Sequence, residues 1–224
     1  MATETLKVRR SASGRVTYEN YANNQERPVA ANQRGEGLWL PAYYNAVAEG
    51  RVFVANRGTA GTPISFSKTA YDADQPQLWI DVPSGTTIIP IVLSVHLELA
   101  AGTITEMIWS VSDVVLGAGT STAVTPANAR TQVSGTQPAS ACSVYRDATG
   151  NTTAPANGFE FARFGDAFVQ EADAENRFIW KASDEGWAPI IQGTGSLVLH
   201  VDAAGTAPSG FVTAVWWEMD TDNS

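Results

Sequence analysis

The feature that most limits the possible folds is a pair of long runs of β-branched and apolar residues, at positions 86–99 and 104–116. Val, Ile and Thr lose side-chain freedom in a helix but pack well on a pleated sheet, so we expect both runs to be strands. The short segment 100–103 predicts a compact, hairpin-like link between them. Pro90 interrupts the first run and has no N–H to donate, which predicts an edge, a bulge or a bend there.

Shorter strand signals lie on both sides of these runs. Turn chemistry at 58–63 separates two of them, and residues 117–140 are expected to form a long irregular loop. A short helix is expected at 43–49 and a helical turn at 166–176. The further predicted strands are 51–55, 77–82, 141–145, 159–163, 177–181, 195–201 and 210–218.

Strand therefore follows strand, and no regular helix of 10–15 residues alternates with them, which argues against a parallel sheet. Eight or nine strands suit an antiparallel two-sheet sandwich of the jelly-roll kind. A chain of 224 residues fits one such domain. We predict an all-β protein with an extended N-terminal arm over residues 1–45 and a β-sandwich over residues 46–224.

The arm and the body differ in charge. Residues 1–36 hold six basic and four acidic side chains, a balance of +2, so the rest of this −9 chain carries −11. Such an acidic body argues against nucleic acid as a partner. A mildly basic arm is suited to tether the protein to an acidic surface, and a solvated tail without a role is the alternative. The candidate contact residues of the arm are Arg9, Arg10, Arg15, Tyr18, Tyr21, Arg27 and Arg34.

The last predicted strand is apolar on both faces. Alternation places residues 211, 213, 215 and 217 on one face and residues 212, 214, 216 and 218 on the other. We expect this strand to lie in the core and also beneath a second layer, which another subunit would supply. Ordinary core packing of its aromatic residues is the alternative. The candidate interface residues are Phe211, Val215, Trp216 and Trp217.

The sequence assembles no catalytic or metal site. His96 and His200 lie in predicted strands, and a zinc site would need three or four converging ligands. Cys142, the only cysteine, is expected to be a buried structural thiol. No glycine-rich segment has the lysine and helix of a phosphate loop. We predict no enzyme, no cofactor and no metal, and take calcium at the acidic loops as the alternative to simple solvation.

The start of the chain lacks the apolar segment of a secretory signal, and no run is long enough to cross a bilayer. We therefore expect a soluble protein that is synthesised in the cytosol and has no membrane partner.

From residue 51 to residue 218 the order of segments resembles the small jelly-roll proteins that decorate the heads of tailed bacteriophages. The segments concerned begin at Arg51 (RVFVA), Gly61 (GTPIS), Leu78 (LWIDVPSG) and Thr206 (TAPSGFVTAVWWE). The resemblance implies a capsid decoration or cement protein on the virion surface. Such a protein is a homo-oligomer, often a trimer, which binds the major capsid protein and clamps neighbouring capsomers.

Other functions remain open at this stage. Another virion part, such as a head fibre, a tail component or a coat protein, would share the same fold. A carbohydrate- or receptor-binding module would stack Trp187, Tyr43 or Tyr44 on sugar rings. An enzyme would need a cleft that contains a carboxylate of strongly shifted pKa.

Overall fold

The computed structural model describes residues 42–66, 68–99, 105–131, 137–150, 152–165, 176–205 and 207–221. Contacts divide the chain between Asn45 and Ala46, and all the strands belong to the second unit. Helix α1 (Ala42–Ala48) confirms the expected short helix. The seven candidate residues of the arm lie outside the described residues, as do residues 166–175, where we predict a helical turn. Within the described residues, neither helix is long and apolar enough to cross a membrane.

The remaining elements confirm an all-β fold. Each of the nine predicted strands is present, with bounds that differ from the expected ones by at most five residues. The only other helix is the single turn α2 (Ala182–Glu185) among the described residues. The strands are β1 (Val52–Arg57), β2 (Ile64–Ser65), β3 (Leu78–Val82), β4 (Thr86–Leu99), β5 (Thr105–Ser112), β6 (Thr120–Val124), β7 (Ala127–Asn128), β8 (Ser143–Gly150), β9 (Phe159–Phe164), β10 (Asn176–Lys181), β11 (Ile191–Gln192), β12 (Gly195–Ala203) and β13 (Ser209–Asp220).

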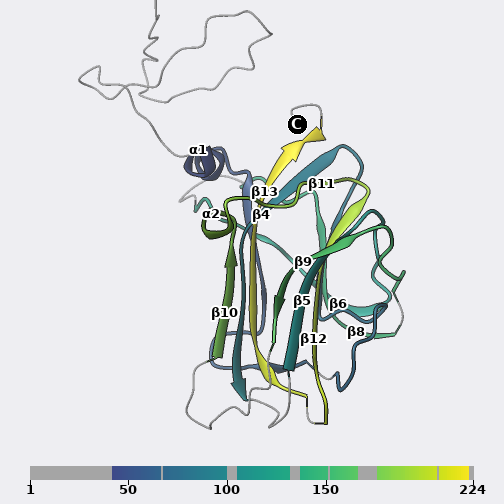
Figure 1. The fold of residues 1–224 in the computed structure, drawn as a ribbon. Helices are drawn as coiled ribbons and strands as arrows, with labels where there is room; N and C mark the ends of the chain where they lie inside the picture. The colour runs from purple at the N-terminus through teal and green to yellow at the C-terminus, as the bar shows by residue number, and fades with distance from the viewer. Residues whose placement is uncertain are drawn as a thin grey trace, which may run out of the picture. The chain divides into compact units, whose positions relative to one another are not determined.

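These strands form two antiparallel sheets packed against each other, as predicted (Figure 1). The first sheet has the order β10-β4-β13-β1-β7, with β11 also paired to β4 and β2 to β13. The second has the order β6-β8-β3-β12-β5-β9. The longest strands, β4 and β13, lie side by side in the middle of the first sheet, and β12 and β5 lie side by side in the second.

The strand pairs are nested along the chain. β1 pairs with β13, β3 with β12, β4 with β10 and β5 with β9, so each pair lies inside the preceding one in sequence. The pairs also alternate between the two sheets. A long hairpin that is wound in this way over two sheets is a jelly roll.

This winding corrects one prediction. β4 and β5 are not a hairpin, because β4 lies in the first sheet and β5 in the second. Each strand is apolar on the face toward the core, so the two can face each other across the sandwich as readily as they can pair. Their closeness in sequence does not distinguish these two arrangements.

A second correction concerns residues 117–140, which are not wholly irregular. β6 and β7 lie in this segment, and they extend the edges of the two sheets beside β8 and β1 respectively. Their residues are mostly small and exposed, with Thr120, Thr122 and Ala123 facing solvent. Such sequences carry no alternation of apolar and polar residues, which is why this part of the chain resembles a loop.

Pro90 lies at a bulge, one of the three possibilities that the sequence left. Val215 of β13 lies opposite Val92, whereas the next residue, Trp216, lies opposite Pro90, so β4 has one additional residue here. The bulge accommodates a proline within a central strand, where the missing N–H would otherwise break the ladder.

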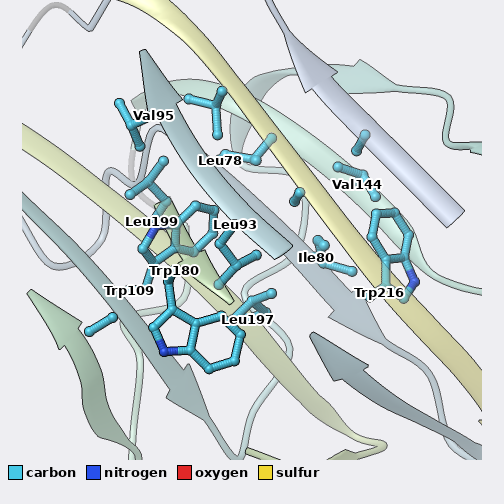
Figure 2. Close-up of a cluster of buried hydrophobic side chains, with 14 of the residues drawn as sticks. Leu78, Ile80, Leu93, Val95, Trp109, Val144, Trp180, Leu197, Leu199 and Trp216 are labelled. Atoms are coloured by element: carbon cyan, nitrogen blue, oxygen red, sulfur yellow. The ribbon is translucent and has the colours of Figure 1, made fainter. Parts of the chain in front are cut away.

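The main core fills the space between the sheets (Figure 2). Its largest members are three tryptophans that are almost inaccessible to solvent, Trp109, Trp180 and Trp216, from β5, β10 and β13. Complete burial of one aliphatic or aromatic side chain typically contributes about 1.5–3 kcal/mol. Aliphatic residues from both sheets pack between the rings, among them Leu78, Ile80, Leu93, Val95, Val144, Leu197 and Leu199.

A smaller core lies on the outward face of the second sheet. Trp79 and Val198 point out from β3 and β12, and Leu116 from the segment after β5 covers them. The Trp79 indole N–H donates to the Gly117 carbonyl at 3.1 Å. The Asp81 carboxylate accepts from the amides of Leu116 and Gly117, at 3.0 and 2.8 Å, which holds this segment against the sheet.

Candidate functional site

The first candidate site is the outward face of the first sheet, where we predict a subunit interface. Side chains alternate along β13, with residues 212, 214 and 216 buried and residues 211, 213, 215 and 217 half-buried. Phe211, Val215 and Trp217 therefore point away from the core, as the two-residue period of a strand requires.

Trp216 corrects the predicted interface. Its side chain has no exposed surface in the single chain, and it packs in the main core 6.2 Å from the Phe53 ring. The indole N–H donates to the Glu218 carboxylate at 2.9 Å, so its polar group is also satisfied inside the protein. Alternation places Trp216 and Trp217 on opposite faces, and the sequence alone does not say which face is inside.

The outward side chains are mostly apolar, with one polar row, Asn56, Thr213 and Ser94, between the valines and Phe211. Val54, Val215 and Val92 lie directly opposite one another on β1, β13 and β4, so they make an unbroken row across three strands. Each of them is half-buried rather than covered. We call this surface the outward apolar face, and it consists of Val54, Ile89, Val92, Ile179, Phe211, Val215 and Trp217.

Charged and polar groups surround this face. The Arg51 guanidinium lies 5.2 Å from the centre of the Trp217 ring, and the His96 ring lies 6.2 Å from that of Phe211. On β10, Arg177 is exposed and Lys181 half-buried. An apolar centre with a polar border is the arrangement of a protein–protein interface.

The second candidate site is a groove of about 500 Å³ on the outward face of the second sheet. Its floor contains Ile108 and Ser110 of β5, whose neighbours Trp109 and Val111 point into the main core. Tyr71 and the segment 155–159 also line it. The groove thus lies over strands whose other face is fixed by the core.

Connections between strands hold the walls of the groove in place. The Thr152 amide and hydroxyl donate to the Asp74 carbonyl at 2.9 and 3.0 Å. The Ala156 amide donates to the Ser112 hydroxyl at 3.0 Å. Gly158 lies so close to β5 that a Cβ there would be 1.7 Å from the Val111 carbonyl oxygen, so only glycine fits.

An ion-paired cluster of three charged side chains lines the groove. The Arg163 guanidinium makes a bidentate pair with Glu160, at 2.6 and 2.7 Å, and reaches Glu106 at 3.3 Å. The hydrogen bonds from Arg163 lower the pKa of Glu160. The side chains are still 37–48% exposed, so they remain accessible to a ligand.

The sequence indicates none of the residues that line the groove. Glu160 and Arg163 are three positions apart, which in a regular strand places them on opposite faces. A bulge in β9 opposite Trp109 and Ser110 brings both side chains to the outward face, where Glu160 lies opposite Ser110 and Arg163 opposite Ile108. No local pattern in the sequence marks this bulge.

Beside the groove, a buried histidine lies under an exposed tyrosine. The His200 ring is 2% exposed and 4.8 Å from the ring of Tyr71. Its Nε2 lies 3.2 Å from the Ala73 carbonyl, while Nδ1 is buried without a partner among the described residues. Burial and the Glu160 carboxylate raise the pKa of Tyr71, and burial and the Glu106 carboxylate raise that of Asp202.

We predict that His200 makes the protein less stable in mild acid. Burial lowers the pKa of His200, since the imidazolium would lose its hydration. The unfolded chain therefore takes up the proton first, near the ordinary value of about 6.5. The stability that neutral His200 provides is present above this pH and is lost as the pH falls toward the folded pKa.

Chemical denaturation from pH 7.5 to pH 5 measures this effect. Between these values, wild type is expected to lose more unfolding free energy than His200→Gln, in which the titrating group is absent. His96→Gln is the matched control, because it removes the other histidine and leaves His200 in place. The prediction would be contradicted if the unfolding free energy of wild type and that of His200→Gln fell equally between pH 7.5 and pH 5.

The candidate sugar-stacking residues and the single cysteine do not line the groove. Trp187 is half exposed and packs against Phe161 at 6.4 Å, and it does not line the groove. The rings of Tyr43 and Tyr44 are exposed on α1 with their centres 4.0 Å apart. Cys142 is buried as expected, and burial raises its pKa. Burial therefore holds this thiol in its unreactive, protonated form.

The two surfaces are suited to binding. In the part of the chain that the structure describes, no three His, Cys, Asp or Glu side chains gather closely enough to hold a metal ion. Comparison of the chain with protein-family models, with curated proteins and with solved structures found no match.

Proposed function

We propose that this protein is a structural virion protein of the capsid decoration type. In this proposal it assembles as a homotrimer through the outward apolar face, binds the major capsid protein on the outside of a phage head and stabilises contacts between capsomers. The observation that supports it is the outward apolar face itself. The main core is already complete on the opposite side of the same sheet, so these side chains are not needed to close the sandwich.

The energetic argument concerns half-exposed apolar area. Val54, Val92 and Val215 form a flat row, and Trp217 adds the largest side chain of the face beside them. Burial of such area releases about 25 cal/mol per Å². Tryptophan is enriched among the residues that dominate binding at interfaces. A second layer over this face therefore stabilises the protein.

Another copy of this chain is the proposed second layer, because the border of the face carries both signs of charge. Arg177 and Lys181 lie on β10, and Glu98 is exposed near the end of β4. A rotated copy can place a carboxylate opposite a cation, which suits a closed symmetric assembly. In such an assembly the basic arms of all subunits are available to contact an acidic shell, and several weak contacts add in avidity.

Val215→Lys is expected to convert the assembly into a monomer. Val215 is at the centre of the row, so a lysine there would place a charge in each apolar contact. Its side chain points away from the main core, so the fold is retained. Light scattering after size exclusion should give three times the chain mass of 23.8 kDa for wild type. The variant should have the mass of a single chain.

Val115→Lys is the matched control for this substitution. Val115 is 39% exposed and lies outside the outward apolar face, so its variant should remain trimeric. A wild-type protein that stays monomeric across a hundredfold range of concentration would refute the interface.

The capsid role has its own test. Virus particles purified from the source of this sequence should carry the protein on their surface, as seen by immunogold electron microscopy. Wild-type protein should also sediment with heads from which it has been stripped. Labelling of tails alone, or no sedimentation with heads, would contradict the decoration role and favour another virion part.

A further inference from the structure

The groove over β5 and β9 is independent of the proposed interface, because it lies on the other sheet. Its volume of about 500 Å³ is that of an ordinary small-molecule site, which typically has about 300–1,000 Å³. It is open to solvent along the sheet rather than enclosed, so it can accept part of an extended ligand. The question is which chemistry its lining recognises.

Two aromatic rings are exposed at the groove. Tyr71 is 53% exposed and Phe159 is 52% exposed, and both line the groove. Large aromatic side chains that remain half in water are typical of surfaces that a ligand covers. A flat ring offers an apolar platform for a ligand that has an apolar face of similar size.

The polar groups offer both donors and acceptors. Arg163 has five N–H donors, of which three bind Glu160 and Glu106, so within the described part of the chain two remain for a ligand. The carboxylates have further lone pairs to accept hydroxyl protons. The ion pairs hold all three side chains in one arrangement, which lowers the entropic cost of binding.

The charges exclude several classes of ligand. Glu106 and Glu160 against Arg163 leave a net charge of −1 in the groove, and the whole chain carries −9. Phosphorylated, sulfated and other anionic ligands are therefore repelled. A metal ion lacks the ligand cluster it would need among the described residues.

We propose that this groove binds a neutral saccharide, with Tyr71 and Phe159 stacking on sugar rings and the Arg163–Glu160–Glu106 cluster hydrogen-bonding their hydroxyls. A pyranose ring has an apolar C–H face and a periphery of hydroxyl groups that both donate and accept. This combination matches exposed aromatic rings beside an ion-paired cluster that offers both donors and acceptors. Because the groove is open, a segment of an oligosaccharide fits it better than a free monosaccharide.

The test uses the full-length labelled protein on an array of neutral glucose-, galactose-, mannose- and N-acetylglucosamine-containing oligosaccharides, with sialylated and sulfated glycans beside them. Wild type is expected to bind a subset of the neutral glycans. Calorimetric titration with the best soluble neutral oligosaccharide then gives the affinity. Phe159→Ala should weaken it about tenfold, as expected for the loss of one stacked ring.

Trp187→Ala is the matched control, because Trp187 is 49% exposed and lies outside the groove. The Trp187→Ala variant should bind the same oligosaccharide with the affinity of wild type. Tyr71→Ala and Glu160→Gln should each weaken binding as Phe159→Ala does. Phe159 is half exposed, so circular dichroism and thermal unfolding should show that its variant keeps the wild-type fold even if Tyr71→Ala does not.

Three results would overturn the saccharide site. Wild type could bind no glycan on the array, bind only anionic glycans, or keep its affinity in Phe159→Ala. The monomeric Val215→Lys variant should bind glycans with the affinity of wild type per chain. Failure of the trimer proposal and failure of the saccharide proposal are therefore distinguishable.

Discussion

Trp216→Ala is expected to lower the free energy of unfolding by about 3–5 kcal/mol, the largest effect of any single substitution considered in this protein. Trp216 is fully buried in the core, in the middle strand of the first sheet (Figure 2). Its ring packs against that of Phe53. Alanine would leave a cavity between two sheets that cannot approach each other, because both are continuous hydrogen-bonded layers. The substitution would also remove the indole donor of the buried Glu218 carboxylate.

Guanidinium chloride unfolding followed by far-ultraviolet circular dichroism measures this loss, with all proteins at one concentration because an assembly adds its own stability. Trp187→Ala is the control for removal of a tryptophan. Since Trp187 is 49% exposed, its variant should lose less than about 1 kcal/mol. Equal losses in the two variants would show that Trp216 is not a core residue.

Asp147→Asn is expected to cost about 2–4 kcal/mol, because it leaves a buried guanidinium without its counter-charge. Arg57 is 1% exposed, and its Nε donates to the Asp147 carboxylate at 2.6 Å. Burial lowers the pKa of Arg57, and the Asp147 carboxylate opposes this shift. Arg57 belongs to β1 and Asp147 to β8, so the pair links the two sheets.

Asparagine is the appropriate replacement, since Asp147 has a φ of 57° and asparagine tolerates this left-handed conformation. Any loss then reports the charge rather than the backbone. Arg146→Gln is the control, because Arg146 is the more exposed partner of the same carboxylate and its replacement leaves the Arg57–Asp147 pair in place. A loss for Asp147→Asn no larger than that of the control would mean that Arg57 does not depend on this partner.

The local elements of the fold were predictable because their signals are local. β-branched residues and the two-residue alternation locate β1, β3, β4, β5 and β13 within a few residues. The same alternation separates Trp216 from Trp217. The proline in β4 marks its bulge, since the loss of one N–H is a property of the residue itself.

The arrangement of these strands was not predictable in the same way. β4 and β5 follow each other closely in sequence but lie in different sheets. Pairing and packing both bury the apolar face of a strand, so the pattern of a single strand does not specify its neighbour. The nested pairs of the jelly roll bring together segments more than a hundred residues apart, as with β1 and β13.

The sequence by itself therefore determined most of the strands, though not β6 and β7, which side chains share a face and that the chain folds as an antiparallel sandwich. Only the tertiary structure decided which face of β13 is covered, so that Trp216 is core and Trp217 is surface. It also decided that a bulge in β9 places Glu160 and Arg163 on one face, beside Tyr71 from a distant segment. The physical reason is that alternation is set by the backbone of one strand, whereas burial and site geometry depend on the register and packing of strands far apart in the chain.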